Sequence, residues 1–320
     1  MMGVLAALLT QLLHAALILA AAPLVVGGVR WGKARLLGRR GPHPLQPLRD
    51  MLKLLRKRPV LADGSSPVTR AAPYVALAAT FLAALLVPGF AQGMLLVPVS
   101  DLLLIAGLLA LARMALALAG HDAGTAFGGL GAAREMTFAA FAEPALLASV
   151  LVLAVLAGTS NLDAIAALFR EGGLGLRVSL LFILLALMAV ALAENARLPV
   201  DNPATHLELT MVHEAMLLEA SGRHLALWEA QAALKLTVWL ALLAAIFLPF
   251  GAAPAGAGPL SWAMGLVLWA GKLALLAAAL AVFETAIAKM RVFRVPEFLG
   301  AAILLAMLAA ALVFITAGLA

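Results

Sequence analysis

The chain has 320 residues, of which 65% are hydrophobic and 12% charged, with a formal net charge of +6 and no cysteine. Soluble domains carry about 25% charged residues, so this composition excludes an ordinary soluble protein and predicts an all-α integral membrane protein. Without cysteine, the chain can form no disulfide and can hold no thiolate-ligated iron–sulfur cluster. The basic residues lie mainly in the connections between apolar runs, as in a membrane protein. We therefore expect the chain to contact a lipid bilayer and no nucleic acid.

Apolar runs divide the whole chain into predicted transmembrane helices. A helix needs about 20 residues to cross a hydrocarbon core of roughly 30 Å. We expect a single membrane domain over residues 1–320 with about eight such helices. The runs cover residues 4–26, 73–90, 99–119, 137–158, 176–193, 232–250, 260–283 and 298–319.

The connection over about residues 28–70 is strongly basic, holding eleven of the 22 lysine and arginine residues. The positive-inside rule places it in the cytoplasm of a bacterial or archaeal cell, and strict alternation then puts both termini on the non-cytoplasmic side of the inner membrane. After Pro42, Pro44 and Pro47, apolar and basic residues alternate at helical spacing. This amphipathic helix either lies on anionic lipid or forms a docking platform for another subunit.

The segment "NLDAIAALFREGG" carries Arg170 on the predicted outer side, where basic residues are otherwise rare. It is short and amphipathic, so we expect it to lie in the outer membrane interface.

Ionisable side chains interrupt several of the apolar runs. Glu143 precedes Pro144 in the fourth run, Arg113 lies in the third, and Lys272 lies near the middle of the seventh. A central charge costs roughly 2.5–3.5 kcal/mol on insertion scales, so such residues usually pair or serve a pathway. We expect intramembrane charge pairing at Arg113, Glu135 and Lys272, with Glu135 or Glu143 reaching Arg113 if the third and fourth spans pack together.

The most polar stretch is "ENARLPVDNPATHLELTMVHEAMLLEASGRH", within a second cytoplasmic segment of about residues 194–230. Asn202 and Pro203 predict a helix start, and the helix is expected to run to about Ser221, enclosed by other helices because no face of it is apolar. His206 and His213 are seven residues apart, roughly 10 Å along a helix, so they cannot share one metal ion. We predict no metal site and instead a relay of carboxyls and histidines that titrate.

Four stretches together resemble one family: "GRRGP" with "LQPLRDMLKLL", "GGLGAAREMTFAAFAEPALL", the polar stretch above, and "AKMRVFRVPEFLG". They resemble the complex I subunit 1 family, and within it the membrane subunit of energy-converting group 4 [NiFe] hydrogenases, of the formate hydrogenlyase subunit 4 and hydrogenase-4 component C type. The resemblance covers about residues 28–300. Quinone-reducing relatives differ at Asn202, Thr205 and His206, and carry their fourth-span glutamate where this chain has Ala140, with Glu143 as the substitute.

The resemblance implies a membrane subunit that anchors a soluble redox module and couples its electron transfer to proton translocation, with no redox centre of its own. The [NiFe] centre and iron–sulfur clusters would lie on partners, namely hydrogenase large and small subunits and an iron–sulfur subunit, beside antiporter-like membrane subunits. The expected docking residues are Arg40, Pro42, Gln46, Arg49, Arg197, Arg291 and Arg294. The expected proton pathway comprises Glu143, Glu194, Asp201, Glu208, His213, Glu214, Glu219 and Glu284.

Three alternatives remain open. The first is a quinone-binding subunit of a complex I-type NADH-quinone oxidoreductase, against which the pattern over residues 201–208 argues. The second is a stand-alone proton or cation transporter, although no second copy of "PVDNPATH" provides the repeat typical of transporters. The third is a purely structural anchor.

Overall fold

The computed structural model describes residues 2–170, 178–202 and 211–318, and over these residues the chain is helical without a β-strand. Seven helices are long and apolar enough to cross a membrane, and a shorter apolar helix accompanies them. The prediction of an all-α integral membrane protein is confirmed. The helices are α1 (Met2–Leu36), α2 (Gln46–Leu55), α3 (Pro67–Leu86), α4 (Leu102–Asp122), α5 (Ala126–Ala157), α6 (Leu162–Arg170), α7 (Val178–Glu194), α8 (His213–Leu217), α9 (Gly222–Phe247), α10 (Pro259–Ala286) and α11 (Val295–Gly318).

Each of the eight apolar runs coincides with a helix, namely α1, α3, α4, α5, α7, α9, α10 and α11. Three of these helices extend at least ten residues beyond their apolar runs: α1 continues to Leu36, α5 begins at Ala126, and α9 begins at Gly222. The extensions are polar, so hydropathy does not detect them. The Thr125 hydroxyl caps the early start of α5 by accepting a hydrogen bond from the Gly128 amide at 3.2 Å.

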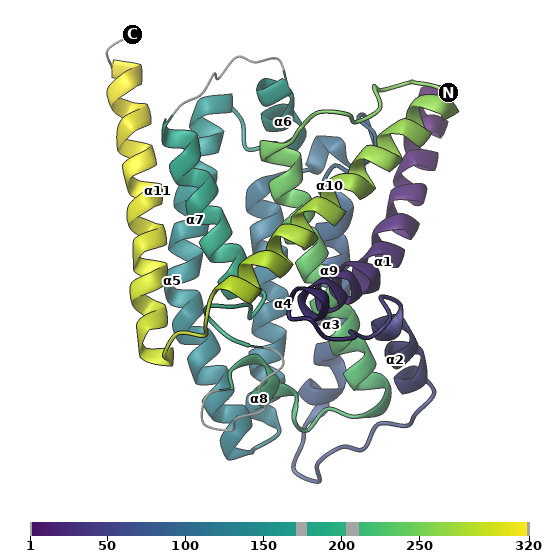
Figure 1. The fold of residues 1–320 in the computed structure, drawn as a ribbon, viewed down its shortest axis with the longest axis vertical. Coiled ribbons are helices and arrows are strands. Elements are labelled where there is room, and N and C mark those ends of the chain that lie inside the picture. Colours follow the sequence, from purple (N-terminus) through teal and green to yellow (C-terminus); the bar gives the residue numbers. More distant parts are fainter. Residues whose placement is uncertain (1, 171–177, 203–210, 319–320) are drawn as a thin grey trace.

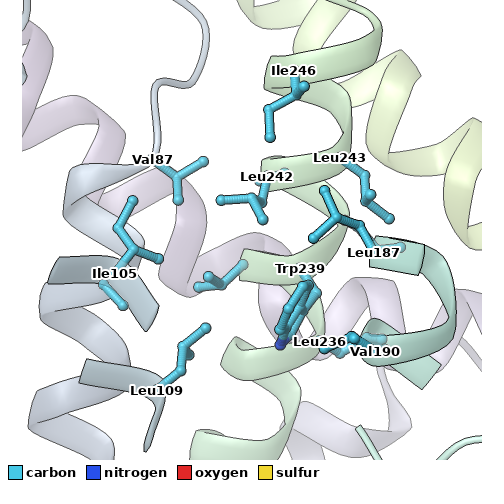
Figure 2. Packing of buried hydrophobic residues seen from close by; sticks show 14 of the residues in the cluster. Val87, Ile105, Leu109, Leu187, Val190, Leu236, Trp239, Leu242, Leu243 and Ile246 are labelled. Atoms are coloured by element: carbon cyan, nitrogen blue, oxygen red, sulfur yellow. The ribbon is translucent and has the colours of Figure 1, made fainter. Parts of the chain in front are cut away.

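Helix α9 forms the centre of the bundle, in contact with α1, α2, α3, α6, α7 and α10, while α11 packs on α5 and α7 at the edge. Figure 2 shows Trp239 and Leu242 of α9 between Ile105 on one side and Leu187 on the other. α9 is apolar around most of its circumference because neighbours surround it.

The two ends of the bundle differ. Both chain ends and α6 lie at one end in Figure 1, whereas α2, α8 and the link from α10 to α11 lie toward the other. The predicted amphipathic segment forms α6, with Leu162 and Ile165 buried. The predicted basic helix forms α2, which contacts both α1 and α9 and buries Met51.

The expected polar helix from Pro203 to Ser221 can be compared with the structure only over residues 211–221, since residues 203–210 lie outside the described chain. There it is helical in part and not continuous. Among residues 211–221, only α8 (His213–Leu217) is helical. Gly222 has a φ of 52°, a left-handed conformation that interrupts a regular helix. Ser221 is held away from the helix axis, because its hydroxyl accepts from the Val60 amide at 2.8 Å and donates to the Val60 carbonyl at 3.0 Å.

Neighbouring glycines on α1 provide a test of the packing between α1 and the first polar segment. A Cβ added at Gly27 would lie 1.8 Å from the Pro44 carbonyl oxygen, whereas one at Gly28 meets nothing within 4 Å. We expect Gly27→Ala to destabilise the purified protein by about 1–3 kcal/mol, because the Pro44 backbone must move. Gly28→Ala is the matched control and should be neutral or slightly stabilising, since alanine favours helix. Thermal unfolding in detergent, followed by tryptophan fluorescence, measures both; equal midpoints would contradict the close contact.

Candidate functional site

A buried cluster of charged side chains joins four helices near the middle of the bundle. The Arg113 guanidinium of α4 donates through Nη1 to Glu194 at the end of α7 and through Nη2 to Glu143 of α5. The Lys235 Nζ of α9 lies 2.9 Å from the second carboxylate oxygen of Glu194. The Arg113, Glu194 and Lys235 side chains are each no more than 7% exposed. Because buried ions are tolerated only in pairs, each partner depends on the others.

The backbone directly after α7 fixes the position of Glu194. Ala196 adopts a φ of 48°, and the amides of Ala196 and Arg197 donate back to the carbonyls of Ala193 and Leu192 at 3.1 and 2.9 Å. These two bonds satisfy carbonyls at the helix end and turn the chain away from the axis of α7. Glu194 is therefore the last helical residue, inside the bundle.

Glu143 differs from the rest of the cluster, because its side chain is 47% exposed on the outside of the described bundle. It lies on a face of α5 that also exposes the apolar side chains of Met136, Leu147 and Leu151. Glu143 is residue 18 of this 32-residue helix, so it lies far from both ends. An ionised group on an apolar lateral face within the bilayer is costly, which makes this carboxylate a candidate contact for another polar group.

A cavity of about 400 Å³ reaches the same cluster from the side of α2 and α8. Its walls come from α1, the segment around Pro42, α2, the end of α7, α8 and α9. Apolar walls include Met51, Leu217 and Trp228. The ionisable side chains that line it are Arg30, Lys33, Glu194, Arg197, His213, Glu214, Glu229 and Lys235. Glu194 and Lys235 thus belong to both the cavity wall and the buried cluster.

A second network connects the wall of this cavity to α10 and to the link that follows it. Glu284, 3% exposed on α10, accepts from Lys33 Nζ at 2.6 Å and from Arg197 Nη1 at 3.4 Å. Asp201 accepts from Lys289 Nζ at 2.6 Å and from the His213 amide at 3.4 Å. These contacts tie the segment after α7 to α1, α8 and the link between α10 and α11.

His213 is uncharged at neutral pH in this setting. Burial, with a further contribution from the nearby Lys235 ammonium, lowers the pKa of His213 to about 4, although Asp201 acts in the opposite direction. The ring is therefore a neutral hydrogen-bonding group in the cavity wall.

The predicted charge pairs need two corrections. Glu135 is buried but forms no ion pair with another side chain of the described residues, because Arg113 is taken up by Glu143 and Glu194. The Lys272 ammonium contacts the carbonyl oxygen of Phe250 and lies 4.7 Å from its ring centroid, and no carboxylate in the described chain pairs with it. The partners Glu194 and Lys235 were missed; the only sequence signal for Lys235 was a lone cation in the apolar run "AALKLTVW".

The remaining predicted residues divide by exposure. Arg40, Pro42, Arg49, Arg291 and Arg294 are exposed, and Gln46 donates to Asp50 at 2.9 Å. Arg197 is buried against Glu284, so it does not form part of an exposed docking surface in this structure. Glu214 lines the cavity, Glu219 is exposed outside both networks, and Glu208 lies outside the described residues. No group of three or more potential metal ligands occurs in the residues that the structure covers.

Comparisons with a family model and with individual known proteins point to the same family. A sequence model of the NADH dehydrogenase family matches residues 8–316. Hydrogenase-4 component C of Escherichia coli is 36% identical over 245 residues, 76% of each chain. Formate hydrogenlyase subunit 4 of the same organism is 34% identical over 243 residues, covering 76% of this chain and 78% of that protein.

The fold also has a solved counterpart. A chain in the structure of the membrane-bound sulfane sulfur reductase, an archaeal respiratory membrane complex, superposes with a TM-score of 0.77. The match covers 95% of this chain and 99% of that chain at 22% identity, and it establishes the shared fold. With the family match over nearly the full length and two relatives above 30% identity, the chain belongs to the NADH dehydrogenase family, of the complex I subunit 1 type.

Proposed function

We propose that this multi-pass membrane protein is the membrane-embedded subunit of an energy-converting [NiFe] hydrogenase or formate hydrogenlyase-like complex. It anchors a soluble redox module and couples the electron transfer of that module to proton translocation. The observation that carries the proposal is an unbroken line of charged side chains from the cavity, through Glu194 and Arg113, to Glu143 on the lateral face.

The line has the properties that coupling requires. Its inner end is a cavity whose wall contains several cations and carboxyls, so a change of charge near the cavity acts on Glu194 in surroundings of low dielectric constant. Glu194 and Glu143 share Arg113, so a proton gained by one carboxylate changes the field on the other. Glu143 is then placed to exchange a proton with a neighbouring membrane subunit, for which the antiporter-like subunits are the candidates.

The docking role belongs to the end of the bundle that carries α2 and α8, which we orient toward the cytoplasm. The exposed Arg40 and Arg49 lie before and within α2, and Arg291 and Arg294 lie before α11. A surface this basic attracts and orients an acidic partner. In this assignment the hydrogenase large and small subunits and an iron–sulfur subunit hold the [NiFe] centre and the clusters, and this chain supplies their platform.

The same cavity also suits a second function, quinone binding, because apolar walls and a few polar groups are typical of cofactor sites. Reduction of a quinone analogue by the purified complex, with hydrogen or formate as donor, would favour that second function over the first.

Docking is tested by reversing charge at one end of the bundle only. The double variant Arg40→Glu with Arg49→Glu should weaken attachment of the soluble module by about tenfold, because two favourable contacts become repulsive. Hydrogenase activity in the supernatant of washed membranes measures the release, while this chain stays in the membrane fraction. Arg170→Glu makes the same kind of change at the opposite end and should release nothing. Activity that remains with the membranes in the double variant, even at high salt, would contradict the assignment.

The coupling of electron transfer to proton translocation is tested by a substitution that keeps the shape of the Glu143 side chain but removes its ionisable group. Glu143→Gln keeps a hydrogen-bonding side chain but cannot exchange a proton, so proton translocation into sealed vesicles should fall to less than about a tenth of wild type. Asp63→Asn, in the exposed first polar segment, is the control and should translocate normally. Both variants should assemble and keep hydrogenase activity with an artificial electron donor. Normal translocation by the Glu143 variant would place the pathway elsewhere.

A further inference from the structure

Glu135 is a buried carboxyl beside the Arg113 cluster that takes part in none of the ion pairs of the described residues. It lies on α5, eight residues before Glu143 and so about 12 Å closer to the α8 end of the bundle. Its side chain is buried, with the residue only 7% exposed. Across the described residues it forms no salt bridge, and its carboxyl oxygens accept no hydrogen bond.

Charged groups nevertheless surround Glu135 from several elements. Lys235 of α9, Glu194 of α7 and Arg113 of α4 all interact with it electrostatically, and so does Asp201 in the segment after α7. α5 also packs against α8, which carries His213 and Glu214. Glu135 therefore lies within electrostatic range of the Arg113 cluster and of Asp201.

The charges of the cluster balance without Glu135. The two cations, Arg113 and Lys235, are matched by the two carboxylates that contact them, Glu143 and Glu194. An ionised Glu135 would add a third negative charge, buried and without a contacting cation. Transfer of an unpaired carboxylate out of water is strongly unfavourable, and binding one proton removes that cost. His213, as a neutral ring, does not supply the missing positive charge.

We propose that Glu135 is the protonated carboxyl of this cluster and holds its exchangeable proton. The step is a reversible one: the acid releases a proton to become a carboxylate, and the same site takes it back. The use of this proton in coupling rests on the proposed function, whereas its location rests on the ion pairs and burial alone.

Infrared absorption of the purified complex in lipid membranes measures the protonation state of Glu135 directly, because a protonated carboxylic acid has a carbonyl band that a carboxylate lacks. Wild type should show a band that Glu135→Gln lacks and Glu143→Gln keeps, and the band should shift in D₂O because the proton exchanges. A spectrum of Glu135→Gln that retains this band would overturn the proposal. So would loss of the band in Glu143→Gln alone.

Aspartate at the same position covers the case in which glutamine prevents assembly. Glu135→Asp keeps an acid with a shorter side chain, so its band should move in frequency rather than vanish. An unchanged band in that variant would also overturn the assignment.

Translocation measurements separate this inference from the function it rests on. If Glu143→Gln stops translocation while Glu135→Gln retains the acid band, the coupling role stands and the inference about Glu135 fails. If the band belongs to Glu135 but both variants translocate protons normally, the coupling role fails while the location of the proton stands. We expect the band to belong to Glu135 and translocation to fail in both variants.

Discussion

The ion pairs of the buried Arg113 guanidinium are the interactions on which the rest of the charged cluster depends. It binds carboxylates from α5 and α7, and Glu194 in turn binds Lys235 of α9. Within a bilayer no water replaces a lost partner, and removal of one partner from a buried pair costs about 3–5 kcal/mol. The ion pairs therefore fix four helices relative to one another at the depth where a membrane protein otherwise has only apolar packing. Apolar packing around Trp239, four residues after Lys235 on α9, adjoins the cluster.

The same ion pairs connect two different surfaces. The cavity reaches Glu194 from the end that carries α2 and α8, and Glu143 emerges on the lateral face of α5. The Glu284 and Asp201 networks hold the segment after α7 against α1 and α10, so the wall of the cavity is built from contacts that are themselves charged. A structural anchor requires burial and pairing, but it does not require a carboxylate half exposed on an apolar face. The exposed position of this carboxylate favours a role in proton exchange with a neighbouring subunit.

Hydropathy alone located every long helix, because the apolar length needed to cross a bilayer is a strong constraint. It could not locate the polar extensions of α1, α5 and α9, which are held by caps and by contacts with other segments. The Arg113–Glu143 pair could be anticipated from adjacent spans. The contributions of Glu194 and Lys235 could not, because they depend on how α7 and α9 pack against α4. A helix that is apolar around most of its circumference gives only a weak period from which to read its orientation. Over the described residues 211–221 the predicted polar helix is present only as α8, and the left-handed Gly222 with the Ser221–Val60 contacts separates α8 from α9.

The central claim is that the redox state of the partner subunits changes the protonation of this buried cluster. Redox-induced infrared difference spectra of the intact complex, recorded while the potential of its electron carriers is stepped, test it most directly. The account predicts carboxyl bands that change with potential in wild type and are altered by Glu194→Gln, which removes the carboxylate shared by the cavity and Arg113. Difference spectra in which no carboxyl band follows the potential, or in which the cluster variant matches wild type, would contradict it.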